Sequence, residues 1–318
     1  TTVKVFENAK GSVNFSREIC GYIQNAQSNI DLCIYSFSVQ SIATALIEAK
    51  ERGVAIRVIY MNREDQTGIE MLKDAEIPVI DNSFGSNDGT NSMHNKFFII
   101  DYYDEDPSND YVMTGSANFT TEGLYSNAQN IIWIQSKGLA AVFTAEFNEM
   151  WGSETSIPNG MLSKFGSAKE VNTPHQIDIN GIRMEQYMGP SDGIINQICK
   201  IIKTSDHSIY LSIFAFTHYD ILNALKEVRE ENPNIRISGV FDEEMKSNSV
   251  YLNLIGEGSS PWNPPADILL DKEPKLLHHK YLLVDPEYSD SDPTVITGSA
   301  NWSYNVQNYN DENTLIIH

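Results

Sequence analysis

The chain has 318 residues, of which 41% are hydrophobic and 20% charged, and its formal net charge at pH 7 is −21. This length allows two domains with separate cores, and the composition is that of a globular protein. No run of about 18 apolar residues occurs, so the sequence predicts no transmembrane helix. Both halves are acidic, which argues against a general nucleic-acid-binding protein, because such binding depends on Lys and Arg neutralising phosphates.

Cysteine content and the first residue give weaker indications. Cys20, Cys33 and Cys199 provide neither a disulfide framework nor the spacing of a metal site. The chain begins with Thr1 instead of methionine, so we expect a processed protein whose signal peptide has been removed. Together with the acidic surface, this start favours a secreted or periplasmic bacterial protein.

The first half of the chain predicts alternating helices and strands. Apolar residues recur either at helical spacing or in short continuous runs, and this order favours parallel strands joined by right-handed crossovers. The expected elements are a helix at 14–27, a strand at 30–38, a helix at 41–53, a strand at 55–60, a short helix near 68–74 and a strand at 78–80.

The second half repeats this order. Its expected elements are a helix at 194–203, a strand at 208–217, a helix at 219–230 and a strand at 235–241. We therefore predict an α/β protein of two similar units, each a mixed, largely parallel sheet flanked by helices, packed as a pseudo-twofold pair. The units are expected at 1–151 and 183–318, the second lacking a final helix, with a Gly-, Ser-, Asn- and Pro-rich linker at 152–182.

One polar pattern occurs in both halves. The sequence HNKFFIID at 94–101 reappears as HHKYLLVD at 278–285, and each copy is followed by a polar loop and then by TGSAN. Core packing would not keep six polar positions in register, so the repeat indicates chemistry. The matched residues are His94, Lys96 and Asp101 with His278, Lys280 and Asp285, and Gly115, Ser116 and Asn118 with Gly298, Ser299 and Asn301.

The residue types in this pattern suit a phosphate. Residues two apart in a strand face the same way, so each His and its Lys point to one side. Imidazole offers a nucleophile or a proton carrier, lysine offers positive charge, and Asn and Ser offer hydrogen-bond donors for developing negative charge. Zinc is the alternative, but two histidines without a carboxylate or cysteine at ligand spacing, each beside a lysine, make a poor zinc site.

Two acidic loops, at 101–110 and 285–293, join the two parts of each pattern. We interpret them as solvated hairpin turns. The alternating Asp104, Asp106, Ser108 and Asp110 could instead bind calcium, but the loop lacks the length and the closing glutamate of an EF-hand.

The doubled pattern of His-x-Lys, four residues, Asp and then Gly-Ser-x-Asn resembles the phospholipase D superfamily over nearly the whole chain. The resemblance implies one active site between the two units, where one histidine attacks phosphorus and the other protonates the leaving alcohol, without metal or cofactor. It implies a catalytic set of His94, His278, Lys96, Lys280, Asp101 and Asp285, in which the aspartates have a more structural role. The phosphate-binding set is Ser116, Asn118, Ser299 and Asn301, with the two lysines also holding phosphate oxygens.

A difference between the two copies suggests different roles for the histidines. Eleven residues after each motif asparagine the first copy has Gln129 and the second has Glu312, a position that buttresses the catalytic histidine in this superfamily. A carboxylate favours an imidazolium acid, whereas an amide leaves a neutral nucleophile. The hypothesis is that His94 is the nucleophile, backed by Gln129, and that His278 is the general acid/base, backed by Glu312. The neighbouring His279 is expected to be structural.

The substrate expected first is a phospholipid, met transiently at a membrane surface by a monomeric enzyme. The loop at 250–265 mixes Leu254 and Trp262 with other apolar residues and could rest on lipid or pack onto its own domain. Phe119 and Trp302 follow the motif asparagines and are expected to line the pocket mouth, where they would suit an acyl chain or a stacked base. A metal-independent nuclease is the alternative, and a catalytically silent binding module is a third hypothesis.

Overall fold

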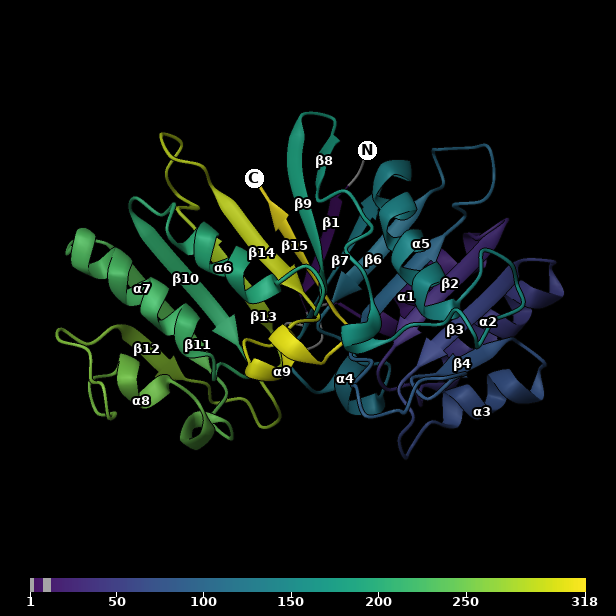
Figure 1. Ribbon diagram of the computed structural model, residues 1–318, viewed down its shortest axis with the longest axis horizontal. Coiled ribbons are helices and arrows are strands. Elements are labelled where there is room, and N and C mark those ends of the chain that lie inside the picture. Colours follow the sequence, from purple (N-terminus) through teal and green to yellow (C-terminus); the bar gives the residue numbers. More distant parts are fainter. Residues whose placement is uncertain (1–2, 8–12) are drawn as a thin grey trace.

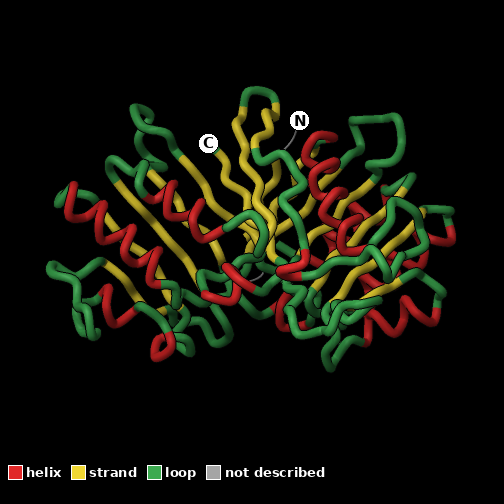
Figure 2. The backbone as a smooth tube through the Cα atoms, viewed as in Figure 1, coloured by secondary structure: helices red, strands yellow, loops and turns green. Residues whose placement is uncertain are grey.

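The computed structural model describes residues 3–7 and 13–318, so the Thr1 start lies outside the described part of the chain. Each half of the sequence builds its own sheet, and the strands of the two sheets converge towards the middle of the molecule (Figures 1 and 2). The strand order is β1-β7-β6-β5-β2-β3-β4 in the first sheet and β12-β11-β10-β13-β14-β15-β9-β8 in the second.

The bounds of the elements in the first unit are β1 (Val3–Glu7), α1 (Phe15–Asn25), β2 (Asn29–Ile34), α2 (Gln40–Glu51), β3 (Ala55–Tyr60), α3 (Thr67–Asp74), β4 (Val79–Asp81), β5 (Lys96–Ile100), β6 (Tyr111–Gly115), α4 (Thr121–Tyr125), β7 (Asn130–Gln135) and α5 (Lys137–Trp151). Those that follow are η1 (Gly166–Ala168), β8 (Gln176–Ile179), β9 (Ile182–Gly189), α6 (Ile194–Ile202), β10 (Ser208–Ile213), α7 (Tyr219–Glu231), β11 (Arg236–Phe241), η2 (Lys246–Asn248), α8 (Tyr251–Leu254), β12 (Asp267–Leu270), β13 (Lys280–Val284), β14 (Thr294–Gly298), α9 (Tyr304–Asn308) and β15 (Glu312–Ile317).

The α/β class and the mixed sheets agree with the prediction, but the sheets are not largely parallel. Only β2–β3–β4 and β10–β11–β12 run parallel, and every other neighbouring pair is antiparallel. The helical crossovers produce the parallel part. The two motif strands of each unit are joined by a short loop, which permits only antiparallel pairing.

The first unit has three layers. Helices α1 and α2 cover one face of the sheet with residues such as Ile19, Leu46 and Leu32 in the core. Helix α5 covers the other face, and its aromatic side chains pack with residues of β9 and β15 from the second sheet. In the second unit β15 is the last element described. No helix among the described residues is long and apolar enough to cross a bilayer.

The predicted linker contains ordered structure. Strand β8, at Gln176–Ile179, lies within the 152–182 stretch and pairs with β9, so the second sheet begins before residue 183. Phe165 is buried in the same stretch. The polar composition of this stretch did not indicate a strand, because β8 lies at the edge of the sheet and most of its side chains are accessible.

Reciprocal polar contacts join the two units. Thr114 Oγ1 donates to Asn313 Oδ1 at 2.6 Å, and Asn130 Nδ2 donates to Thr297 Oγ1 at 2.9 Å. The four residues are two matched pairs in the repeat, each 183 positions apart. The junction therefore has the pairwise symmetry expected of a pseudo-twofold arrangement.

Glycine is required where the second part of each motif meets this junction. Gly115 and Gly298 have φ values of +149° and +150°. A Cβ atom on Gly115 would lie 2.3 Å from Asn130 O, and one on Gly298 would lie 2.3 Å from Asn313 O. The glycines thus let strands β6 and β14 approach the backbone that carries the junction asparagines.

The loop that was considered for lipid contact packs onto its own domain. Trp262 and Leu254 belong to the core of the second unit, and the Trp262 ring lies 5.9 Å from the Arg229 guanidinium carbon. The lipid-contact interpretation is therefore wrong for these two residues.

Candidate active site

Each motif histidine sits where a loop of one unit runs beside a loop of the other. The backbone N–H of His94 donates to Asp311 O at 2.9 Å, and that of His278 donates to Ala128 O at 2.8 Å. Asp311 and Ala128 occupy matched positions of the repeat, just before Glu312 and Gln129. Short parallel bridges between Met93 and Asp311, and between Leu277 and Ala128, accompany these bonds.

The side chains that buttress the histidines come from the opposite units. Nδ1 of His94 lies 2.7 Å from Glu312 Oε1, and Nδ1 of His278 lies 2.8 Å from Gln129 Oε1. The hypothesis that paired His94 with Gln129 and His278 with Glu312 is therefore wrong. The residues preceding β7 and β15 reach across the junction, a consequence of the twofold packing that spacing within one motif cannot reveal.

The two lysines are buried beside the histidines. Lys96 is fully buried and its Nζ donates to His94 O at 2.7 Å. Lys280 is 2% exposed, and its Nζ donates to His278 O at 3.0 Å and lies 3.3 Å from His278 Nε2. Both ammonium groups are held next to the imidazoles with few protein acceptors, so each retains capacity to bind an anion.

The asparagines and the serines of the pattern have different positions. Oδ1 of Asn118 and Oδ1 of Asn301 are buried without a hydrogen-bond partner in the described structure, so each retains an unused acceptor. Ser299 Oγ instead donates to Glu312 Oε2 at 2.6 Å, and Ser116 Oγ accepts from Asn130 N at 3.0 Å. The serines thus hold the framework around the site, although they were predicted to bind phosphate.

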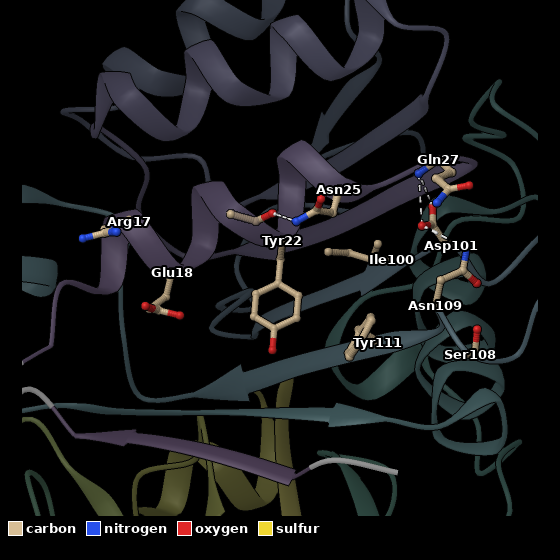
Figure 3. Close-up of a pocket in the computed structure, with 11 residues that line it drawn as sticks. Arg17, Glu18, Tyr22, Asn25, Gln27, Ile100, Asp101, Ser108, Asn109 and Tyr111 are labelled. Atoms are coloured by element: carbon tan, nitrogen blue, oxygen red, sulfur yellow. Dashed lines mark hydrogen bonds between the residues drawn. The ribbon is translucent and has the colours of Figure 1, made fainter.

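The motif aspartates lie away from the histidines. Asp101 follows β5 at the opposite end from His94, about 16 Å along the strand at 3.3 Å per residue. Its carboxylate accepts backbone N–H bonds from Gln27 and Ser28, at the rim of a pocket of about 520 Å³ beside α1 (Figure 3). Asp285 accepts the same kind of bonds from residues 206–208. Listing the aspartates with the catalytic set is therefore wrong, and their structural role agrees with the geometry.

Burial lowers the pKa values of the two motif histidines and the two motif lysines. It lowers the pKa of His94 to about 4 against the opposing effect of Glu312, and it lowers the pKa of His278 well below its usual value. It also lowers the pKa of Lys96 to about 7 and that of Lys280 strongly. Burial therefore favours the neutral forms of these groups, whereas a neighbouring anion would favour their charged forms.

Residues 19–151 and 198–318 match the family model described as cardiolipin synthase, phospholipase D-like domain. The chain belongs to this phospholipase D-like family. Among curated relatives, mitochondrial cardiolipin hydrolase of Drosophila melanogaster is 34% identical over 160 residues, which are 45% of this chain and 61% of the relative. The mouse protein of the same name is 30% identical over 131 residues, 40% of this chain and 53% of the relative. The chain therefore spans little more than half the length of these relatives.

Solved structures share the fold of this phospholipase D-like chain. Phosphatidylserine synthase of Haemophilus influenzae Rd KW20 aligns with 99% of this chain and 82% of its own, with a TM-score of 0.69 and 13% identity. Polyphosphate kinase of Porphyromonas gingivalis aligns with 99% of this chain and 47% of its own, with a TM-score of 0.65 and 11% identity. At these identities the similarity concerns the fold alone.

The walls of the phospholipase D-like site differ from those expected. Phe119 and Trp302 are buried in the two cores, with exposures of 0% and 2%, and do not line an entrance. The rings of Tyr35 and Phe214 lie instead 4.7 Å from the His94 ring and 4.8 Å from the His278 ring. The repeated stretches IYSFS and IFAFT could have indicated these aromatic residues, because Tyr35 comes directly after β2 and Phe214 directly after β10.

His279 and the acidic loops take no part in the site. His279 Nδ1 lies 3.1 Å from Asn130 Oδ1, in the same place as the bond between Asn313 and Asn95, which agrees with a structural role. Within 101–110, carboxylates of Asp104 and Asp106 accept N–H bonds from their own loop. The described residues contain no group of three or more His, Cys, Asp or Glu side chains that could hold a metal.

A buried ion cluster from the linker supports the His94 side of the site. The Lys169 ammonium donates to Glu146 of α5 and to Gly189 O at 2.7 Å, and lies 3.1 Å from Asp311 Oδ1. Asp311 also accepts from Gly166 N at 2.7 Å, and its carbonyl holds His94. Sequence reasoning missed this lysine because it lies in the stretch read as a linker.

We predict that Lys169→Met lowers the free energy of unfolding by about 3 kcal/mol, because it leaves two buried carboxylates without their cation. Urea unfolding followed by circular dichroism would measure the change. Lys164→Met is the matched control, since Lys164 belongs to the same segment but is 36% exposed, and it should leave the midpoint nearly unchanged. Equal effects of the two substitutions would contradict the prediction.

We also predict that sulfate binds less tightly as the pH rises from about 6 to 9. Lys96 has a pKa of about 7 and must take up a proton when the anion binds above that pH, so affinity falls by at most about tenfold per pH unit. Isothermal titration calorimetry would measure this, because sulfate itself does not titrate in the range. Lys96→Met should weaken and flatten the profile, unlike Lys137→Met at an exposed position. A pH-independent affinity in the unmodified protein would contradict this expectation.

Proposed function

We propose that this protein is a phosphodiesterase of phospholipase D type that hydrolyses or transfers phospholipid head groups through a phosphohistidine. The observation that carries the proposal is a reciprocal pair of imidazoles, each bonded to its own buried lysine through its backbone and each contacted by a side chain of the opposite unit. One chain supplies both halves of the site, so we propose a monomeric enzyme. The family and its relatives named for cardiolipin support lipid chemistry.

In the proposed first step, Nε2 of His94 attacks phosphorus. A proton on Nδ1 faces the Glu312 carboxylate at 2.7 Å, which leaves the Nε2 lone pair for the new N–P bond. Phosphorylation makes this ring positive, and the carboxylate stabilises that charge. The rule applied to the sequence, by which a carboxylate favours an acid, would reverse the two roles for this pairing. We propose His94 as the nucleophile on a different ground, namely that the Glu312 carboxylate stabilises the positive phosphohistidine.

His278 completes the proposed cycle as general acid and base. Its Nδ1 faces two acceptors, Gln129 Oε1 at 2.8 Å and Ser116 O at 3.1 Å, so Nε2 is left to exchange protons with the substrate. It donates a proton to the leaving oxygen as the P–O bond breaks. It then takes a proton from water or an alcohol, whose oxygen displaces His94 from phosphorus.

The lysines and asparagines would hold the non-bridging oxygens of the phosphate. Lys96 and Lys280 are buried, so their attraction for the developing charge is weakly screened by water. The Nδ2 groups of Asn118 and Asn301 would add uncharged donors from the two units. These four groups surround the phosphorus whichever head group is cleaved, and they would equally serve a nuclease.

We predict that the protein releases head groups from phospholipid micelles without added metal and leaves single-stranded DNA intact. The net charge of −21 opposes a nucleic-acid substrate. Mass spectrometry of lipid products and gel analysis of a labelled oligonucleotide would measure both activities. His94→Ala and His278→Ala should each lower turnover by at least about 10³-fold. Cleavage of DNA without lipid turnover would favour the nuclease alternative.

We predict that the covalent phosphoryl adduct forms on His94. Rapid quenching during turnover, followed by peptide mass spectrometry under alkaline conditions, would locate it. His278→Ala should lengthen the life of the adduct, because the base that activates water is missing, and Glu312→Gln should slow its formation. An adduct on His278 would reverse the two roles.

A further inference from the structure

The two halves of the site carry opposite charges at one matched position. In the β2–β3 ladder Ile34 pairs with Tyr60, and in the β10–β11 ladder Ile213 pairs with Phe241. The third residue beyond each strand is Arg63 in the first unit and Glu244 in the second, and both side chains are exposed. The duplication therefore provides a guanidinium on one side of the phosphate site and a carboxylate on the other.

Arg63 lies within the reach of a substrate at His94. Its guanidinium carbon is 4.8 Å from the centre of the Tyr35 ring, and the same ring lies 5.2 Å from Lys96 Nζ and 4.7 Å from the His94 ring. A guanidinium stacked on an aromatic face keeps its N–H groups directed outwards along its edge. Its charge also contributes to the lowered pKa of Lys96, although burial has the larger effect.

No carboxylate lies within ion-pair distance of Arg63 in the described structure. Two other exposed cations differ from it in this respect, since Lys275 lies 3.1 Å from Glu122 and Lys246 lies 3.3 Å from Glu243. An exposed arginine that is held in place by stacking but lacks an acidic partner is ready to bind an anion from solution.

The second unit has the opposite character at the matched positions. Phe214 replaces Tyr35 and has no hydroxyl group, and Asp242, 2% exposed, replaces Met61 and acts electrostatically on Lys280. Glu243 and Glu244 follow it at the surface. An anionic substituent on this side of the phosphorus would meet carboxylates, whereas a neutral or cationic one would not.

We propose that Arg63, stacked on Tyr35, forms a subsite for a second phosphate of the substrate, on the first-unit side of the scissile phosphodiester. The proposal rests on the proposed function and adds a specificity-determining residue, which would favour phospholipids that carry a second phosphate over those that carry one. A nucleic-acid strand would place phosphates on both sides of the reacting one, and those on the second-unit side would meet the carboxylates of Asp242 and Glu244. A lipid with one additional phosphate avoids that repulsion.

The test compares cardiolipin, which has two phosphates, with phosphatidylglycerol, which has one. Each is presented as a trace component of the same neutral detergent micelles, so the surface charge is equal. Arg63→Gln should lower the ratio of kcat/KM for cardiolipin to that for phosphatidylglycerol by about 10-fold, the effect of losing one charge-assisted contact. Arg63→Lys should restore part of the ratio. Arg17→Gln, an equal charge change at an exposed position within α1, should leave the ratio unchanged.

The outcomes separate this inference from the proposed function. An unchanged ratio in Arg63→Gln, or the same change in Arg17→Gln, would overturn the subsite while lipid turnover itself persists. Failure of the unmodified protein to cleave either lipid would overturn the proposed function. If Arg63→Gln impaired cleavage of an oligonucleotide but not of cardiolipin, the second phosphate would belong to a nucleic acid and the lipid assignment would be overturned.

Discussion

The site depends on an exchange across the junction, in which each unit supplies the side chain that orients the other unit's histidine. Glu312 faces His94 and Gln129 faces His278, while backbone bonds from Asp311 and Ala128 fix the loops that carry these histidines. Neither unit holds a complete set of contacts. The reciprocal Thr–Asn bonds beside the site keep the two sheets in the one register in which all these contacts form.

Within this symmetric framework the two histidines have chemically different surroundings. A carboxylate stands opposite one histidine and an amide opposite the other, and the aromatic walls differ by one hydroxyl group. Asp311 has a buried lysine partner, whereas the matched Ala128 needs none. Such differences are possible in a fused duplication because each copy of a residue can change independently, which identical chains in a homodimer cannot do.

The candidate reactive residues could be predicted from the sequence because the same residues occur in both halves of the chain at the same spacing. Each motif lysine donates to the backbone of the histidine of its own copy, and the α/β class follows from alternating apolar periods. The strand directions could not be predicted in the same way, because the crossover helices suggested parallel pairing, whereas the short loops reverse the direction of most strands.

The contacts of Gln129 and Glu312 with the histidines could not be predicted either, since they are decided by packing between the two units. Lys169 was hidden because its cluster is assembled from three distant segments.

The reciprocal contacts have a consequence for half of this molecule on its own. A lone first unit would expose His94, Thr114 and Asn130 on a surface shaped to receive the same residues of a second copy. That is the definition of an isologous interface, here enclosed within one polypeptide. The fold therefore retains the geometry of a homodimer of half-length chains, with the stretch between α5 and β9 serving as the covalent tether that makes the partnership permanent.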